Sequence, residues 1–161
     1  MIGRVGEDST RSAQSLGSQI EAVVRTIHRP ILITTSHFRK PETVMVAFDG
    51  SATSHKTVQM LASSPLCEGL PIHIVMVGTD SEENQNELEK ARTTLASSGL
   101  LVHAEIRLGE VESVLHAYQA EHGIDLLVMG AYGHSRIRQF LVGSTTTTML
   151  RTSTLPVLLL R

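Results

Sequence analysis

The sequence predicts a doubly wound α/β fold built on an open, parallel, five-stranded sheet. From Thr43 onward, short runs of β-branched and aliphatic residues alternate with amphipathic segments, which is the pattern of repeated βαβ units. Aromatic residues make up only 3% of the chain, so the core must be aliphatic, as in buried parallel strands and their covering helices. A chain of 161 residues suffices for one such domain and is short for two.

The expected elements follow from where these runs begin and end, because turn-forming or helix-capping residues separate them. In chain order, the five predicted strands are Thr43–Phe48, Ile72–Val77, Leu101–Arg107, Asp125–Met129 and Leu155–Leu160. The helices predicted between them run from about Ala52 to Ser63, Ser81 to Ser98, Val111 to Gly123 and Ser144 to Thr152. A doubly wound connection gives the strand order 3-2-1-4-5. Pro156 places the fifth strand at an edge or marks its first residue.

Composition argues against several classes of protein. The net charge is −2 and the basic residues are scattered, so no positive surface is expected for a nucleic acid. No apolar run approaches the roughly 18 to 20 residues that span a bilayer, so a soluble protein is expected. Cys67 is the single cysteine and no histidine or cysteine spacing is typical of zinc, which predicts no metal site and a cytoplasmic location.

The first 34 residues repeat the end of the chain. Gly17–Leu32 aligns without gaps on Gly143–Leu158, 126 residues later, whereas Gly3 and Gly6 match Gly130 and Gly133 with a separation of 127. Only the last helix and strand are duplicated, so we interpret residues 1–34 as the remnant of an upstream copy, 35–41 as a linker and 42–161 as a complete domain. The remnant is expected not to bind nucleotide. Its strand, residues 31–34, is expected to pair with a final strand of this chain or of a second copy.

The glycine-rich segment that follows the fourth strand is the strongest candidate site. Gly130, Gly133 and Gly143 have the spacing G-x2-G-x9-G, and the hydroxyl residues Ser144 and Thr145 follow at the start of a helix. Glycines let the backbone approach a phosphate, and a helix N-terminus presents free N–H groups to anions. Turn glycines followed by a serine cap are the structural alternative. The spacing is neither that of a Walker P-loop nor that of the dinucleotide fingerprint G-x-G-x-x-G.

Other candidates lie near the same edge of the predicted sheet. Asp49 ends the first strand and is suited to a ribose hydroxyl, although an Asx turn explains it equally well. Val77 ends the second strand, where free backbone groups would recognise an adenine edge. His134 and Arg136 lie between the motif glycines as candidate phosphate contacts, and an exposed loop is the plainer explanation for both.

At these residues the sequence resembles the universal stress protein family, in its ATP-binding branch and its bacterial tandem form. The resemblance rests on Thr43–Ser51, on the motif Gly130–Ser144 and on the final strand Leu155–Leu160. It implies a Rossmann-like fold of the adenine nucleotide alpha hydrolase type, and a homodimer that pairs final strands. It also implies ATP, ADP or AMP as ligand, with or without Mg²⁺. It places Asp49 at the ribose and Val77 near adenine. The residues that it places around the ribose and phosphates are Gly130, Gly133, Gly143, Ser144 and Thr145.

The function expected from this resemblance is regulatory nucleotide binding in a stress response. No Walker lysine, general base or pair of metal ligands is evident beside the phosphates, so strong catalysis is not expected. A slow ATPase or self-phosphorylating enzyme is one alternative. A structural dimerisation module that binds no nucleotide is the other.

Overall fold

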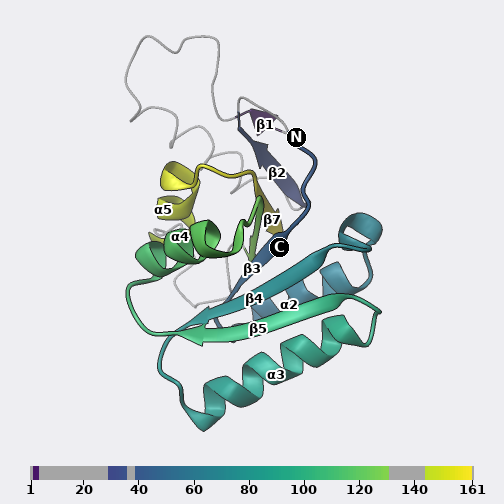
Figure 1. The fold of residues 1–161 in the computed structure, drawn as a ribbon, viewed down its shortest axis with the longest axis vertical. Coiled ribbons are helices and arrows are strands. Elements are labelled where there is room, and N and C mark those ends of the chain that lie inside the picture. The colour runs from purple at the N-terminus through teal and green to yellow at the C-terminus, as the bar shows by residue number, and fades with distance from the viewer. Residues whose placement is uncertain (1, 4–28, 36–38, 131–143, 161) are drawn as a thin grey trace.

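The computed structural model describes residues 2–3, 29–35, 39–130 and 144–160. These residues form one seven-stranded sheet with helices on both faces (Figure 1). The elements are β1 (Ile2–Gly3), β2 (Ile31–Thr34), β3 (Val44–Phe48), α2 (Ala52–Ala62), the 3₁₀ helix η1 (Pro65–Cys67), β4 (Pro71–Val77), α3 (Glu82–Ala96), β5 (Leu101–Arg107), α4 (Val111–His122), β6 (Leu126–Gly130), α5 (Ser144–Thr152) and β7 (Val157–Leu160).

The sheet confirms a doubly wound α/β architecture, but its strand count and overall order differ from the prediction. The full order is β1-β2-β7-β6-β3-β4-β5, so the five predicted strands are neighbours and two further strands extend the sheet beyond β7. Moreover, β2 runs antiparallel to β7, which makes the sheet mixed rather than entirely parallel. The predicted count stopped at the fifth strand, although residues 31–34 were separately expected to pair with a final strand. Strand β1 and the antiparallel direction of β2 were not predicted. An exposed β7 edge would leave a row of unpaired backbone groups.

Strand β2 covers that edge with an apolar segment. Ile31 is 5% exposed and Ile33 is fully buried, and the two residues pair with Leu159 and Val157. The predicted pairing of residues 31–34 with a final strand is therefore confirmed, within one chain. The edge of β7 that a homodimer would use through residues 155–160 is occupied by β2 in this fold.

The end of the chain shows why proline marks the strand start. Strand β7 begins at Val157 rather than at the predicted Leu155. Pro156 has no N–H to donate, yet its carbonyl accepts a hydrogen bond from the Leu127 amide at 3.0 Å. Pro156 therefore lies immediately before the first residue of β7, one position from the predicted strand start. The predicted edge position is wrong, because β7 has a neighbour on each side.

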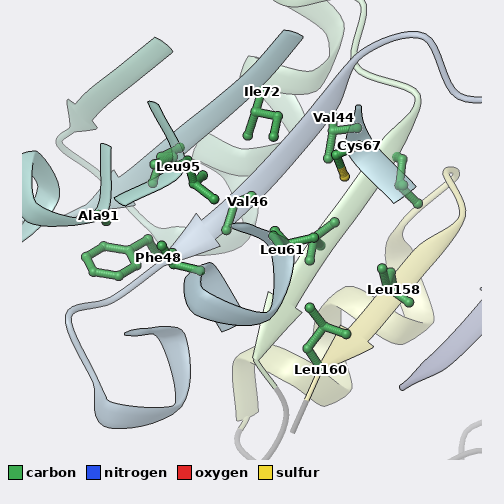
Figure 2. Close-up of a cluster of buried hydrophobic side chains, with 14 of the residues drawn as sticks. Val44, Val46, Phe48, Leu61, Cys67, Ile72, Ala91, Leu95, Leu158 and Leu160 are labelled. Atoms are coloured by element: carbon green, nitrogen blue, oxygen red, sulfur yellow. The ribbon is translucent and has the colours of Figure 1, made fainter. Parts of the chain in front are cut away.

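The core has two layers, one on each face of the sheet, because neighbouring residues of a strand point to opposite faces. On one face, Met45 and Leu127 pack with Leu115 of α4 and Met149 of α5. Figure 2 shows the other face, where Val44, Val46 and Phe48 of β3 meet α2 and α3. Strand β3 therefore has buried residues on both faces, as a central parallel strand requires.

Candidate functional site

The carboxyl ends of β3, β4 and β6 lie at one edge of the sheet, where the direction of winding reverses. Strand β3 pairs in parallel with β4 on one side and with β6 on the other. The last pairs are Phe48 with Met76 and Ala47 with Met129, so the three strands end almost level with one another. Loops that leave such strands in opposite directions create a crevice, which is the usual ligand site of open α/β sheets. The structure thus brings Asp49, Val77 and Gly130 to this shared edge.

Asp49 forms the turn that connects β3 to α2. Its Oδ1 accepts a hydrogen bond from the Ser51 amide at 3.0 Å, and the Ser51 side chain then caps α2 by accepting from the Ser54 amide at 3.2 Å. Partial burial raises the pKa of the Asp49 carboxyl, but hydrogen bonds from Ser51 and Ser54 outweigh it and leave the pKa below its usual value of 3.8. Asp49 is therefore an exposed, ionised carboxylate at neutral pH, able to accept further hydrogen bonds.

The turn explains Asp49 structurally without excluding a ligand. Its carboxylate has several lone-pair sites, and a hydroxyl placed beside Asp49 would find an acceptor already oriented by the turn. The Asx turn that the sequence suggested as an alternative is present. Binding to a ribose hydroxyl remains a prediction that has to be tested separately from the turn.

Val77 is the last residue of β4 and extends one residue past the last β3 pair. It pairs with Arg107 of β5, and the next amide, that of Gly78, donates to the Arg107 carbonyl at 3.0 Å. The Gly78 N–H is therefore already part of the sheet. The Val77 side chain is half-buried against the cluster that faces α4 and α5. An adenine edge at this position would have to form hydrogen bonds with groups other than the Gly78 amide.

Gly130 ends β6, and its lack of a side chain has a packing cause. A Cβ atom on Gly130 would lie 2.8 Å from Thr53 Cγ2 and 3.3 Å from Thr57 Oγ1, both on α2. Helix α2 thus passes so close to the end of β6 that only glycine fits without movement. The need for glycine at position 130 thus comes from packing against α2, about 75 residues away in sequence. Neither the turn nor the phosphate interpretation of Gly130 takes this packing into account.

Helix α5 begins at Ser144 as predicted, so Ser144 and Thr145 open the helix that follows the glycine segment. The other predicted contacts, Gly133, Gly143, His134 and Arg136, lie outside the described residues. Their place relative to Asp49 and Val77 stays a prediction.

Sequence reasoning missed a row of small polar residues on the first turns of α2. Thr53, Ser54 and Thr57 are 8%, 3% and 1% exposed, and Thr57 Oγ1 donates to the Thr53 carbonyl at 3.0 Å. The spacing of these residues puts them on the helix face that covers the ends of β3 and β6. That spacing was visible in the sequence as small residues where a core-facing helix normally carries large apolar ones.

A second contact that the sequence did not reveal fixes α2 to α3. His55 Nε2 lies 2.7 Å from Glu87 Oε2, and the His55 ring meets Phe48 edge-on at 5.0 Å. Glu87 also accepts from Lys90 at 2.6 Å. These contacts hold the two helices together beside the Asp49 turn.

Two searches of the described ranges bear on other kinds of site. Among residues 2–3, 29–35, 39–130 and 144–160, no group of three or more histidine, cysteine, aspartate or glutamate side chains is placed to hold a metal ion. Within the same ranges, no helix has both the length and the apolar character that crossing a membrane requires.

Comparison with known proteins gives a consistent result. A model of the universal stress protein family matches residues 76–161. Universal stress protein Slr1230 of Synechocystis sp. is 39% identical over 163 residues, an alignment that covers 100% of this chain and 57% of that protein. Universal stress protein MJ0577 of Methanocaldococcus jannaschii is 27% identical over 81 residues, which are 50% of each chain. The chain spans about half the length of these curated relatives.

Solved structures share the fold. A universal stress protein from Archaeoglobus fulgidus superimposes with a TM-score of 0.71 at 22% identity, covering 91% of this chain and 53% of that one. A universal stress protein in complex with cAMP gives a TM-score of 0.62 at 22% identity, covering 76% of this chain and 99% of that one.

Proposed function

The chain belongs to the universal stress protein family, and on this premise we propose that it is a stress-response regulator that binds ATP or another adenine nucleotide. The single observation that supports the site most is the placement of Asp49 and Gly130 at the ends of neighbouring strands β3 and β6. The winding of the sheet reverses between these two strands, and such a crevice accepts nucleotides in many α/β proteins. The related fold that holds cAMP supports an adenine nucleotide as the ligand class.

In this proposal the ionised Asp49 accepts hydrogen bonds from ribose hydroxyls, and Val77 lies beside adenine. The backbone and hydroxyls of the motif surround the ribose and phosphates through Gly130, Gly133, Gly143, Ser144 and Thr145. Arg136 supplies a cationic contact to the phosphates, and the His134 side chain a further contact. The start of α5 at Ser144 supports this arrangement, since a helix N-terminus favours an anion. Bound Mg²⁺ would neutralise phosphate charge, with the phosphates themselves as its main ligands.

We also propose that the chain carries parts of two family units. Residues 1–34 form the end of one unit, 35–41 a linker and 42–161 the complete second unit. The pairing of β1 with β2 supports this, because Ile2 pairs with Ile33 just as Met129 pairs with Leu159 at the repeated positions. Strand β2 takes within one chain the place that a second copy's final strand would take in a homodimer. We place the protein in the cytoplasm, where Cys67 stays reduced.

The test is isothermal titration of the purified chain with ATP and Mg²⁺, alongside variants of Asp49. Asp49→Asn keeps an oxygen for the Ser51 amide but removes the charge, so binding weakens about 10- to 100-fold if a hydrogen bond to that charge is worth about 1.5–3 kcal/mol. Asp49→Ala removes the turn as well. Glu68→Gln is the charge-matched control, because Glu68 is exposed and precedes β4 at the opposite edge of the sheet.

Three outcomes separate the proposed functions. Binding that weakens in Asp49→Asn and not in Glu68→Gln supports the nucleotide site. If Asp49→Asn and the parent chain bind nucleotide with equal affinity, Asp49 is not part of the site. If the parent chain, purified free of nucleotide, does not bind, a structural module is favoured. Adding a Gly143→Asp variant tests the motif, because a carboxylate there repels phosphate. Release of phosphate that falls in Asp49→Asn would favour a slow ATPase.

A further inference from the structure

Three histidines from separate elements meet beside one tyrosine at the β4–β5 edge of the sheet. They are His73 of β4, His103 of β5 and His122 of α4, and with Tyr118 they are called the histidine cluster here. The His73 ring stacks on His103 with centroids 5.4 Å apart and lies 5.1 Å from that of His122. Tyr118 and His122 are closer still, at 4.1 Å. The cluster therefore joins the edge strand β5 and the last turn of α4 to β4.

The surroundings of His73 favour its neutral imidazole. His73 Nδ1 lies 2.9 Å from the hydroxyl of Tyr118, which is only 2% exposed. His122 Nε2 is buried, and although a carboxylate oxygen of Glu121 lies 3.5 Å away, the two atoms do not form a hydrogen bond. Burial, and then the neighbouring His122 and His103, hold the pKa of His73 below its usual value of 6.5. A proton added to His73 places a cation whose ring centroid lies 5.4 Å from that of His103 and 5.1 Å from that of His122, and this protonation costs folding free energy.

The charged groups around the cluster offer only partial compensation. On β5 these are Glu105 and Arg107, and on α4 the nearest is Glu121, whose carboxylate lies 3.2 Å from Arg107 Nη2 and 3.5 Å from His122 Nε2. Glu105 also pairs with Arg107, whose guanidinium stands 5.2 Å above the Tyr118 ring. Arg107 thus shares both carboxylates and is itself a cation beside the histidines.

The remaining neighbour of His73 brings no charge to the cluster. On the third side, β3 places the apolar Met45 opposite His73. Protonation of all three imidazoles would therefore set three new positive charges and Arg107 against the carboxylates of Glu105 and Glu121 alone.

We propose that the histidine cluster is a pH-dependent contact that holds β5 and the last turn of α4 on β4 while its imidazoles are neutral, and releases them on acidification. The sign follows from linkage. The unfolded chain takes up the His73 proton near pH 6.5 and the folded chain only at lower pH, so stability is full above that range and falls as pH drops below it. The same β4–β5 ladder continues to Val77 and Arg107. The proposal does not depend on nucleotide binding.

Hydrogen exchange of the whole chain at about pH 7.5 and 5.5, corrected for intrinsic exchange rates, is the direct test. We expect protection of the β5 amides and of the α4 amides near His122 to fall on acidification, by at most about tenfold for one imidazole, with little change in β3 and β6. His103→Gln removes an exposed member of the cluster and leaves the His73–Tyr118 contact and the burial of His73 in place, so this variant should lose part of the pH dependence. His116→Gln is the matched control on α4, because His116 contacts Thr152 instead.

A second measurement keeps the proposal falsifiable if a variant folds poorly. Imidazole resonances of the unmodified chain should show His73 titrating below pH 6.5, and His103→Gln should move that midpoint upward. Equal protection of β5 at both pH values would overturn the proposal. The proposal would also be overturned if the pH dependence of β5 protection were as large in His103→Gln as in His116→Gln.

Discussion

Leu32 pairs with Leu158 across the antiparallel contact between β2 and β7, and the two residues occupy equivalent positions of the sequence repeat. The flanking pairs are Ile31 with Leu159 and Ile33 with Val157. The sequence repeat relates Ile31 to Val157 and Ile33 to Leu159, so it converts one flanking pair into the other. The contact therefore has the local two-fold form of an interface between two identical strands, although one chain supplies both. This relationship makes β2 part of the domain's core.

Replacing Ile33 should reveal how much β2 contributes to folding. Ile33 is fully buried against β7, so Ile33→Ala should lower the free energy of unfolding by about 2–5 kcal/mol in urea titrations. Arg29→Ala is the control, since Arg29 is exposed just before the strand. A loss in Ile33→Ala no larger than in the control would mean that β2 is dispensable.

A methyl group at Gly130 should destabilise the domain through α2. The added Cβ would lie 2.8 Å from Thr53 Cγ2, so Gly130→Ala should cost about 1–3 kcal/mol of unfolding free energy. Combining it with Thr53→Ser removes the clashing methyl and should recover part of the loss. Gly78→Ala is the matched control, because its Cβ would meet only Asn84 at an ordinary 3.5 Å. The packing explanation fails if Thr53→Ser rescues nothing.

Asp125 should be important for the start of β3. Its carboxylate accepts from the amides of Glu42 and Thr43 at 3.0–3.1 Å, which ties the segment before β3 to the start of β6. Asp125→Ala removes a charged acceptor that water replaces less well at the half-buried Thr43 amide, and it should lower the unfolding free energy by about 1–3 kcal/mol. Asp125→Asn keeps one acceptor oxygen, so its unfolding free energy should lie between those of the parent chain and Asp125→Ala. Asp80→Ala, at an exposed loop, serves as control, and equal losses at both positions would refute the role of Asp125.

Glu110 should make the start of α4 sensitive to acid. Its Oε2 accepts from the Ser113 amide at 3.0 Å, and the backbone and side-chain hydrogen bonds of Ser113 hold the pKa of Glu110 below its usual 4.5. The stabilisation is therefore full above pH 4.5 and is lost as pH falls through the lowered pKa. The urea midpoint of Glu110→Gln should depend less on pH, between about pH 3 and 6, than that of the parent chain. Identical pH profiles would contradict the capping role.

The part of the fold that depends on local sequence was predictable, and the part that depends on distant contacts was not. Alternating apolar runs and capping residues such as Ser81 and Gly123 located the strands and helices of residues 43–160. The closeness of Thr53 to Gly130 could not be predicted, because it depends on how α2 crosses the sheet. The histidine cluster could not be predicted for the same reason, since its three histidines are 19 to 49 residues apart and show no periodic spacing.

By itself the sequence determined a doubly wound α/β domain, a repeated final strand and a glycine-rich segment after the fourth predicted strand, because periodicity and turn chemistry act over a few residues. Only the tertiary structure decided that β2 closes the β7 edge, that Asp49 already forms a turn beside the end of β6, and that His73 contacts His103, His122 and Tyr118. Those outcomes depend on strand pairing and side-chain packing between distant segments, where burial and charge proximity outweigh local preference.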